Sequence, residues 1–174
     1  SIAMFASGQR RFICGLAKKV LLANTFALTA DAVWKSEPEM MGSATAWLGA
    51  LAYTMQIYYD FSGYSDMAIG LGRMFGFRFK ENFAYPYTSL SIQEFWRRWH
   101  ISLSSWFKEY VYFPLGGSRC GNVKTYRNVF IVFLLTGIWH GANFTFLMWG
   151  IMYALLQVIE RLFLGKVLEK NPIK

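Results

Sequence analysis

The sequence is poor in charge, in proline and in cysteine. Charged residues make up 16% of its 174 positions, against about 25% in an average soluble domain. The two cysteines, Cys14 and Cys120, are too few for a disulfide framework, and no CxxC pair offers a zinc site. Four prolines and a hydrophobic fraction of 55% exclude a disordered or collagen-like chain. The composition therefore predicts a folded and strongly apolar protein.

Two long stretches are almost without charge. Between residues 40 and 72 only Asp60 and Asp66 carry a full charge, and between residues 128 and 159 no side chain does. A largely apolar stretch of about 18 residues or more is long enough to cross a bilayer as a helix. A soluble domain of this size rarely buries two helices that are apolar on all sides. We therefore predict an all-α fold, a polytopic integral membrane helical bundle.

Each of these stretches is longer than a single crossing of about 20 residues. We therefore expect a tilt, a break or a partial re-entry in each of them. The candidate breaks are Ser62–Gly63 in the first stretch and Gly137 or Gly141 in the second.

Basic residues gather between the two stretches. The net charge is +8, and residues 73–127 hold nine Lys or Arg against three Glu. If this interval is one loop, the positive-inside rule places it on the cytoplasmic side of the membrane. This rule accounts for the basic charge, and the sequence shows no RNA-binding module. We therefore expect membrane lipid as a partner and no nucleic acid.

The N-terminal region has two interpretations. Phe12–Trp34 is apolar enough to cross a membrane, but Lys18 and Lys19 lie at its middle. Two lysines at the centre of a lipid-facing helix would cost roughly 5–7 kcal/mol. The helix therefore either lies at the membrane interface or buries its lysine face against other helices.

An aromatic segment lies within the basic interval. Ser91 and Glu94 have the spacing of a capping box, which predicts a helix from Ser91 to about Tyr112, ahead of Pro114. A basic face opposite an aromatic face predicts a helix that lies in the membrane interface or re-enters the membrane. His100, on the aromatic face, is either a hydrogen-bonded packing residue or a proton acceptor. The aromatic face comprises Trp96, Trp99, His100, Leu103, Trp106, Phe107 and Tyr110.

Apart from tyrosine, His140 is the only titratable residue of the second uncharged stretch. A helix that starts near Val129 would place His140 roughly 16 Å deep, close to the middle of the bilayer. An ionisable side chain at that depth must face a cavity or a partner, so we predict a functional group. Gly137 and Gly141 leave space beside it for a ligand or a close helix contact. A structural hydrogen bond between helices is the alternative.

Missing motifs exclude several reaction classes. The chain has no GxSxG elbow, no P-loop and no HExxH, and neither histidine begins an HxxxD motif. A zinc site would need widely scattered ligands, so we expect no metal. These ligands would be His100, His140, Asp60 and Asp66. The remaining class is transfer of a group to a hydroxyl that a histidine deprotonates.

Three ordered blocks of the sequence resemble the membrane-bound O-acyltransferase (MBOAT) family, and within it the bacterial alginate O-acetyltransferase branch. They are Tyr58–Ala68 (YYDFSGYSDMA), Phe95–Ser104 (FWRRWHISLS) and Phe133–Ala142 (FLLTGIWHGA). The connecting segment Tyr112–Arg119 (YFPLGGSR) is typical of the same branch. The resemblance extends over residues 8–160.

This resemblance implies a multi-pass enzyme of the bacterial inner membrane. Such an enzyme moves an acyl group, usually acetyl, from a cytoplasmic thioester donor, acetyl-CoA or another acyl thioester. The acceptor is a hydroxyl of an exported polysaccharide such as alginate, and a periplasmic acyltransferase partner often finishes the transfer. The resemblance implies a tunnel through the membrane and no bound cofactor. It makes His140 the expected catalytic base, and His100 the second essential position as second base, proton relay or donor-side contact.

The same blocks supply six further candidates for the substrate tunnel: Asp60, Tyr64, Asp66, Arg97, Arg98 and Trp139. The first three either orient groups in the cavity or cap a helix break. The two arginines either attract donor phosphates or anchor to anionic headgroups, and the tryptophan would form a wall of the tunnel.

Two other functions compete with acyl transfer. One is a transporter or channel segment in which His140 relays protons or ions. The other is a non-catalytic scaffold for a periplasmic partner. We expect residues 1–174 to be the central part of one MBOAT membrane domain, with flanking transmembrane helices missing on both sides, and this piece alone to be inactive.

Overall fold

The computed structural model describes residues 1–37, 39 and 41–164. It divides the chain into two compact units, Ser1–Asn82 and Phe83–Lys174. The described residues form helices, turns and one isolated β-bridge, so the all-α prediction is confirmed. Residue 40, at the start of the first uncharged stretch, and residues 165–174 of the predicted domain lie outside the described part.

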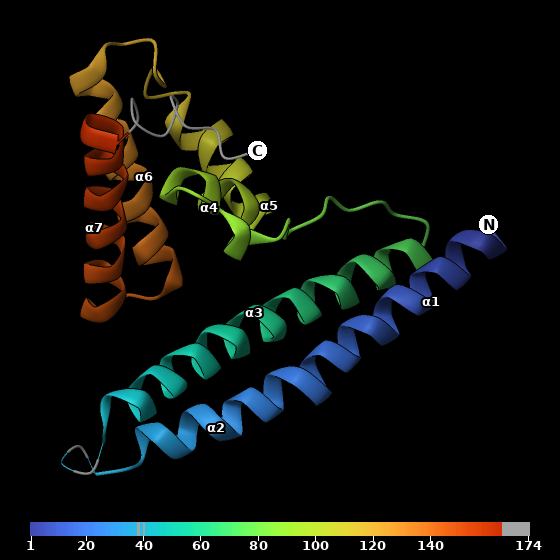
Figure 1. Ribbon diagram of the computed structural model, residues 1–174. Coiled ribbons are helices and arrows are strands. Elements are labelled where there is room, and N and C mark those ends of the chain that lie inside the picture. Colours follow the sequence, from blue (N-terminus) through green and yellow to red (C-terminus); the bar gives the residue numbers. More distant parts are fainter. Residues whose placement is uncertain (38, 40, 165–174) are drawn as a thin grey trace. The chain divides into compact units, whose positions relative to one another are not determined.

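The first unit is a helical hairpin (Figure 1). One arm runs through α1 (Ile2–Ala17), the π-helical turn η1 (Lys18–Ala23) and α2 (Asn24–Trp34). The other arm is α3 (Ser43–Met74), whose 32 residues extend over about 48 Å. Because α3 runs unbroken through residues 62 and 63, the predicted break at that point is wrong.

Glycines on both arms bring the two backbones of this hairpin into contact. A Cβ atom on Gly15 would lie 2.6 Å from the carbonyl oxygen of Gly63, and one on Gly8 would lie 2.6 Å from that of Gly70. Within each arm the two glycines are seven residues apart, which is about two helical turns, so both lie on one face. Gly63 is therefore a packing residue inside a helix.

The second unit contains two longer helices that pack side by side (Figure 1). They are α6 (Asn122–His140) and α7 (Phe144–Ile159), and α7 continues into the π-helical turn η5 (Glu160–Leu164). The chain turns between them at Gly141, which has φ of 154°. The predicted break at Gly141 is thus confirmed, whereas Gly137 lies within α6 and packs against the backbone of α7.

Short helices precede this pair. The predicted single helix from Ser91 to about Tyr112 is wrong, because the chain breaks at Trp99 and His100. The short elements are η3 (Pro86–Thr88), α4 (Ile92–Arg98), α5 (Ile101–Phe107) and the π-helical turn η4 (Lys108–Tyr112).

By length and composition alone, two helical segments of the described chain could cross a membrane. Ile2–Trp34 has a mean hydropathy of 1.4 and Phe144–Leu164 has 1.5, with only 11% and 22% of their most apolar windows buried. Most of their apolar side chains therefore face away from their own unit. Of the two uncharged stretches, only the second contains one of these two segments. The helices α3 and α6 do not reach the same mean hydropathy.

Candidate active site

His100 lies at the break between α4 and α5. α4 ends at Arg98, and His100 adopts the left-handed conformation with φ 46° and ψ 55°. The Ala84 amide donates to the Arg98 carbonyl at 3.0 Å, and the Ser104 hydroxyl donates to the Trp96 carbonyl at 3.2 Å. Both carbonyls therefore accept hydrogen bonds from groups that a continuous helix would not supply. A left-handed residue with a side chain costs about 1–2 kcal/mol, and such strain is typical of functional sites.

His140 is the last residue of α6, and the chain reverses directly after it. The Asn143 side chain accepts a hydrogen bond from the Thr145 amide at 3.4 Å and thereby caps α7. The second uncharged stretch is therefore a pair of helices. His140 lies at the turn between them and not within one continuous span.

The two histidines contact the same indole ring. The ring centroids of His100 and Trp139 are 5.9 Å apart, and those of Trp139 and His140 are 5.0 Å apart. Two rings of α7 also contact His140, Trp149 at 5.1 Å and Phe146 at 5.8 Å. Trp139 is 56% exposed, so this cluster is open on one side. The fold thus brings together three of the predicted site residues.

His100 is held in its neutral form. Burial lowers its pKa to about 4, and the charge of His140 acts in the same direction. A neutral imidazole can accept a proton or donate a hydrogen bond to a substrate. The indole that both histidines contact carries only an N–H donor, so it cannot itself pass a proton from one ring to the other.

The two predicted arginines differ in their contacts. Arg98 forms an ion pair with Glu94 and donates to the Thr88 hydroxyl at 2.9 Å. Arg97 is exposed and forms no ion pair within the described residues. Of the two guanidinium groups, that of Arg97 is the one available to an external anion.

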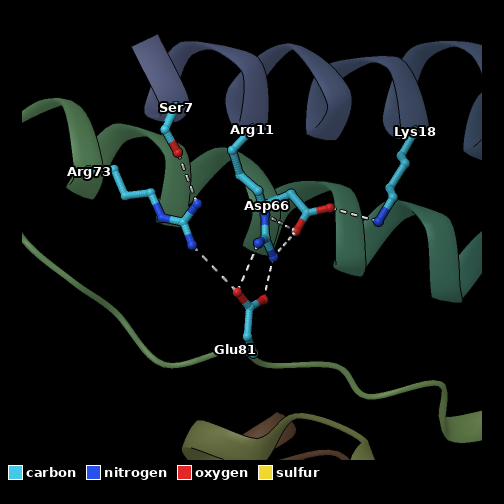
Figure 2. A network of polar contacts seen from close by, with 6 residues as sticks. All are labelled: Ser7, Arg11, Lys18, Asp66, Arg73 and Glu81. Atoms are coloured by element: carbon cyan, nitrogen blue, oxygen red, sulfur yellow. Dashed lines mark hydrogen bonds and ion pairs between the residues drawn. The ribbon is translucent and has the colours of Figure 1, made fainter. Parts of the chain in front are cut away.

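Asp66 lies in a charged network within the first unit (Figure 2). Lys18 donates to one of its carboxylate oxygens at 2.7 Å, and Arg11 Nε donates to the other at 2.8 Å. Arg11 also donates to Glu81 at 2.8 Å, and Arg73 approaches the same carboxylate to 3.8 Å. Asp66 thus neutralises cations of the facing arm, and its role in a substrate cavity remains a prediction.

Asp60 and Tyr64 also lie on α3. Lys19 forms an ion pair with Asp60, and Tyr64 is 62% exposed. Because α3 is continuous here, the alternative in which these residues cap a helix break is wrong. Of the two interpretations of the N-terminal region, contact of its lysines with another helix is confirmed.

Comparison with known proteins identifies the family. Residues 2–168 match the membrane-bound O-acyltransferase family, MBOAT. The chain belongs to this family. A Pseudomonas putida protein named "Probable alginate O-acetylase AlgI" is 56% identical over 97% of this chain and 34% of that protein. A Helicobacter pylori "Peptidoglycan O-acetyltransferase" is 46% identical over 90% of this chain and 29% of that protein.

A more distant MBOAT relative is named for a different acyl group. A Bacillus subtilis "Teichoic acid D-alanyltransferase" is 35% identical over 64% of this chain and 30% of that protein. The chain therefore spans about a third of the length of the curated relatives it matches.

Two ring neighbours of His140 were not predicted from the sequence. Phe146 and Trp149 both belong to α7 and contact His140. Together with Tyr153 they are spaced by three and four residues, which places all three on one face of a helix. This spacing is the signal that could have identified the face of α7 that meets His140.

Proposed function

We propose that the full-length protein is a membrane O-acyltransferase that moves an acetyl group from a thioester donor to hydroxyls of an exported polysaccharide such as alginate. The donor is acetyl-CoA or another acyl thioester, and no bound cofactor takes part. The 56% identity to "Probable alginate O-acetylase AlgI" supports this substrate class. The relatives named for peptidoglycan and teichoic acid support an acceptor in the cell envelope.

The observation that carries the proposal is the contact of His100 and His140 with one indole ring in an MBOAT chain. In the proposed step, the oxygen of the acceptor hydroxyl attacks the carbonyl carbon of the thioester. His140 takes the hydroxyl proton as general base while the new C–O bond forms. The C–S bond then breaks, and the proton passes to the leaving thiolate, which restores the neutral imidazole.

The other predicted residues would support this step. His100 serves as second base, proton relay or donor-side contact, and Trp139 forms a wall of the tunnel. Arg97 offers its guanidinium to donor phosphates, whereas Arg98 is already paired. Asp60, Tyr64 and Asp66 orient groups in the cavity.

We further propose a multi-pass protein of the bacterial inner membrane, with the donor on the cytoplasmic side and a periplasmic acyltransferase as partner. The 174 residues would form the central part of the membrane domain, in keeping with the 34% of the relative's length that they cover. Flanking helices would complete the tunnel, so we expect this piece alone not to transfer acetyl groups. Robust acetyl transfer by the isolated piece would contradict this.

The test is acetylation of the polysaccharide by cells that carry the full-length protein with His140→Ala. Loss of a general base reduces the rate by about 100-fold or more, so we expect acetylation to disappear while the protein still inserts into the membrane. Val123→Ala, at a position 82% exposed in the same unit, is the matched control and keeps normal acetylation. Normal acetylation by the histidine variant would overturn the proposal.

A further inference from the structure

A buried carboxylate of the second unit caps α4 from another helix. Glu160, the first residue of η5, is 3% exposed. Its carboxylate accepts hydrogen bonds from the backbone amides of Ile92 and Gln93, the second at 3.2 Å. Both amides belong to the first turn of α4, where no carbonyl of the same helix can accept from them. Glu160 therefore supplies acceptors that the local sequence of α4 lacks.

Two further amides near this end of α4 are bound locally. The Ser91 hydroxyl accepts from the Glu94 amide at 3.0 Å, and the Glu94 carboxylate accepts from the Leu90 amide at 2.9 Å. α4 has only seven residues, and it ends just before the strained backbone of His100. A shift at the start of so short a helix is therefore passed on to His100.

The helix that carries Glu160 also contacts the other histidine. Trp149 of α7 lies 5.1 Å from His140 and 5.6 Å from Trp96 of α4, measured between ring centroids. Tyr153, one turn further along α7, lies 5.1 Å from Trp96. One continuous helical segment thus meets His140, the middle of α4 and, at Glu160, the start of α4.

We infer that Glu160 is a positioning residue that holds α4 so that His100 stays against Trp139, beside His140. The inference rests on the proposed function, because it concerns the two histidines of that site. Its physical basis is that loss of the carboxylate leaves two partly buried backbone amides without their acceptor. A glutamine of the same shape would turn an NH2 donor towards one of the two amides, so it cannot replace both hydrogen bonds.

The experiment compares Glu160→Gln with the wild type in the purified full-length protein. Diethyl pyrocarbonate modifies neutral imidazole, and peptide mass spectrometry reads the rate at each histidine separately. We expect labelling of His100 to rise by about fivefold or more, because local opening becomes easier, while His140 changes little. Acetyl transfer is expected to fall by about 10- to 100-fold, since small displacements of a catalytic group are costly.

Two control variants separate positioning from general stability. Glu109→Gln removes an exposed carboxylate of the same unit and should match the wild type in labelling and transfer. Asn128→Ala removes a fully buried side chain that donates to the carbonyls of Leu115 and Gly117. It should lower the melting temperature while the ratio of His100 to His140 labelling stays that of the wild type.

Two results would overturn the inference. One is wild-type labelling of His100 together with wild-type transfer in Glu160→Gln. The other is an equal rise in labelling at both histidines, as expected from a general loss of stability. The labelling does not depend on acyl transfer, so absence of transfer in the wild type would contradict the proposed function alone.

Discussion

Lys18 and Asp66, 48 positions apart in the sequence, form an ion pair between the two arms of the first unit, with Nζ 2.7 Å from a carboxylate oxygen. The side chain of Asp66 is 12% exposed and that of Lys18 is 35% exposed. A charge with so little solvent contact requires a partner. The pair explains how an otherwise apolar segment holds lysines at its middle.

Loss of this carboxylate should destabilise the hairpin. We expect Asp66→Asn to lower the free energy of unfolding by about 3 kcal/mol, because it leaves Lys18 without its counter-charge at a site with little solvent contact. Asp60→Asn is the matched control: the Asp60 side chain is 50% exposed, and an exposed pair contributes about 1 kcal/mol or less. Thermal unfolding of the full-length protein in detergent measures both, and equal losses would contradict the prediction.

A side chain at Gly63 should separate the two arms. The Gly63→Leu variant would force a Cβ atom to within 2.7 Å of the Gly15 carbonyl oxygen, and such overpacking costs about 1–3 kcal/mol or more. We expect a strongly reduced yield of monodisperse protein in size-exclusion chromatography. Gly42→Leu is the control, since a Cβ atom there meets nothing within 4 Å. A normal yield from Gly63→Leu would show that the close contact is not required.

The backbone conformation at residue 100 should make substitutions of His100 differ in stability, although all of them remove the imidazole. Its φ of 46° suits asparagine and disfavours a β-branched side chain. We expect His100→Val to be less stable than His100→Asn by about 1–2 kcal/mol. Both variants should lose acetyl transfer, because both lack the ring. Equal melting temperatures would mean that the left-handed turn is not maintained in the folded protein.

Acid should destabilise the protein partly through His100. Burial lowers the pKa of His100 to about 4, from the ordinary 6.5 of the unfolded chain. Between these two pH values the unfolded state binds more protons, so stability falls as the pH falls from 6.5 towards 4 and is unaffected above 6.5. His100→Gln lacks this contribution. Its melting temperature should therefore drop less than that of the wild type on acidification, and an equal drop would contradict the burial of His100.

Properties that depend on neighbouring residues were predictable from the sequence. The long uncharged stretches and the capping box at Ser91 predict helices, because charge placement and capping act over a few residues. The three sequence blocks pointed to the MBOAT family and to His100, His140 and Trp139. Gly141 was a candidate break because a glycine there allows a backbone conformation that other residues avoid.

Other features were decided only by contacts between distant residues. Ser62–Gly63 resembles a helix break, but whether a glycine bends a helix or admits a neighbour depends on the facing arm, which here presents Gly15. The capping box predicts where α4 begins, yet its end depends on Ala84, which binds the Arg98 carbonyl from outside the helix. Glu160 reaches the start of α4 across 68 residues. Hydrogen bonds and packing over such separations do not follow from local periodicity, so only the tertiary structure determined how the two histidines are held.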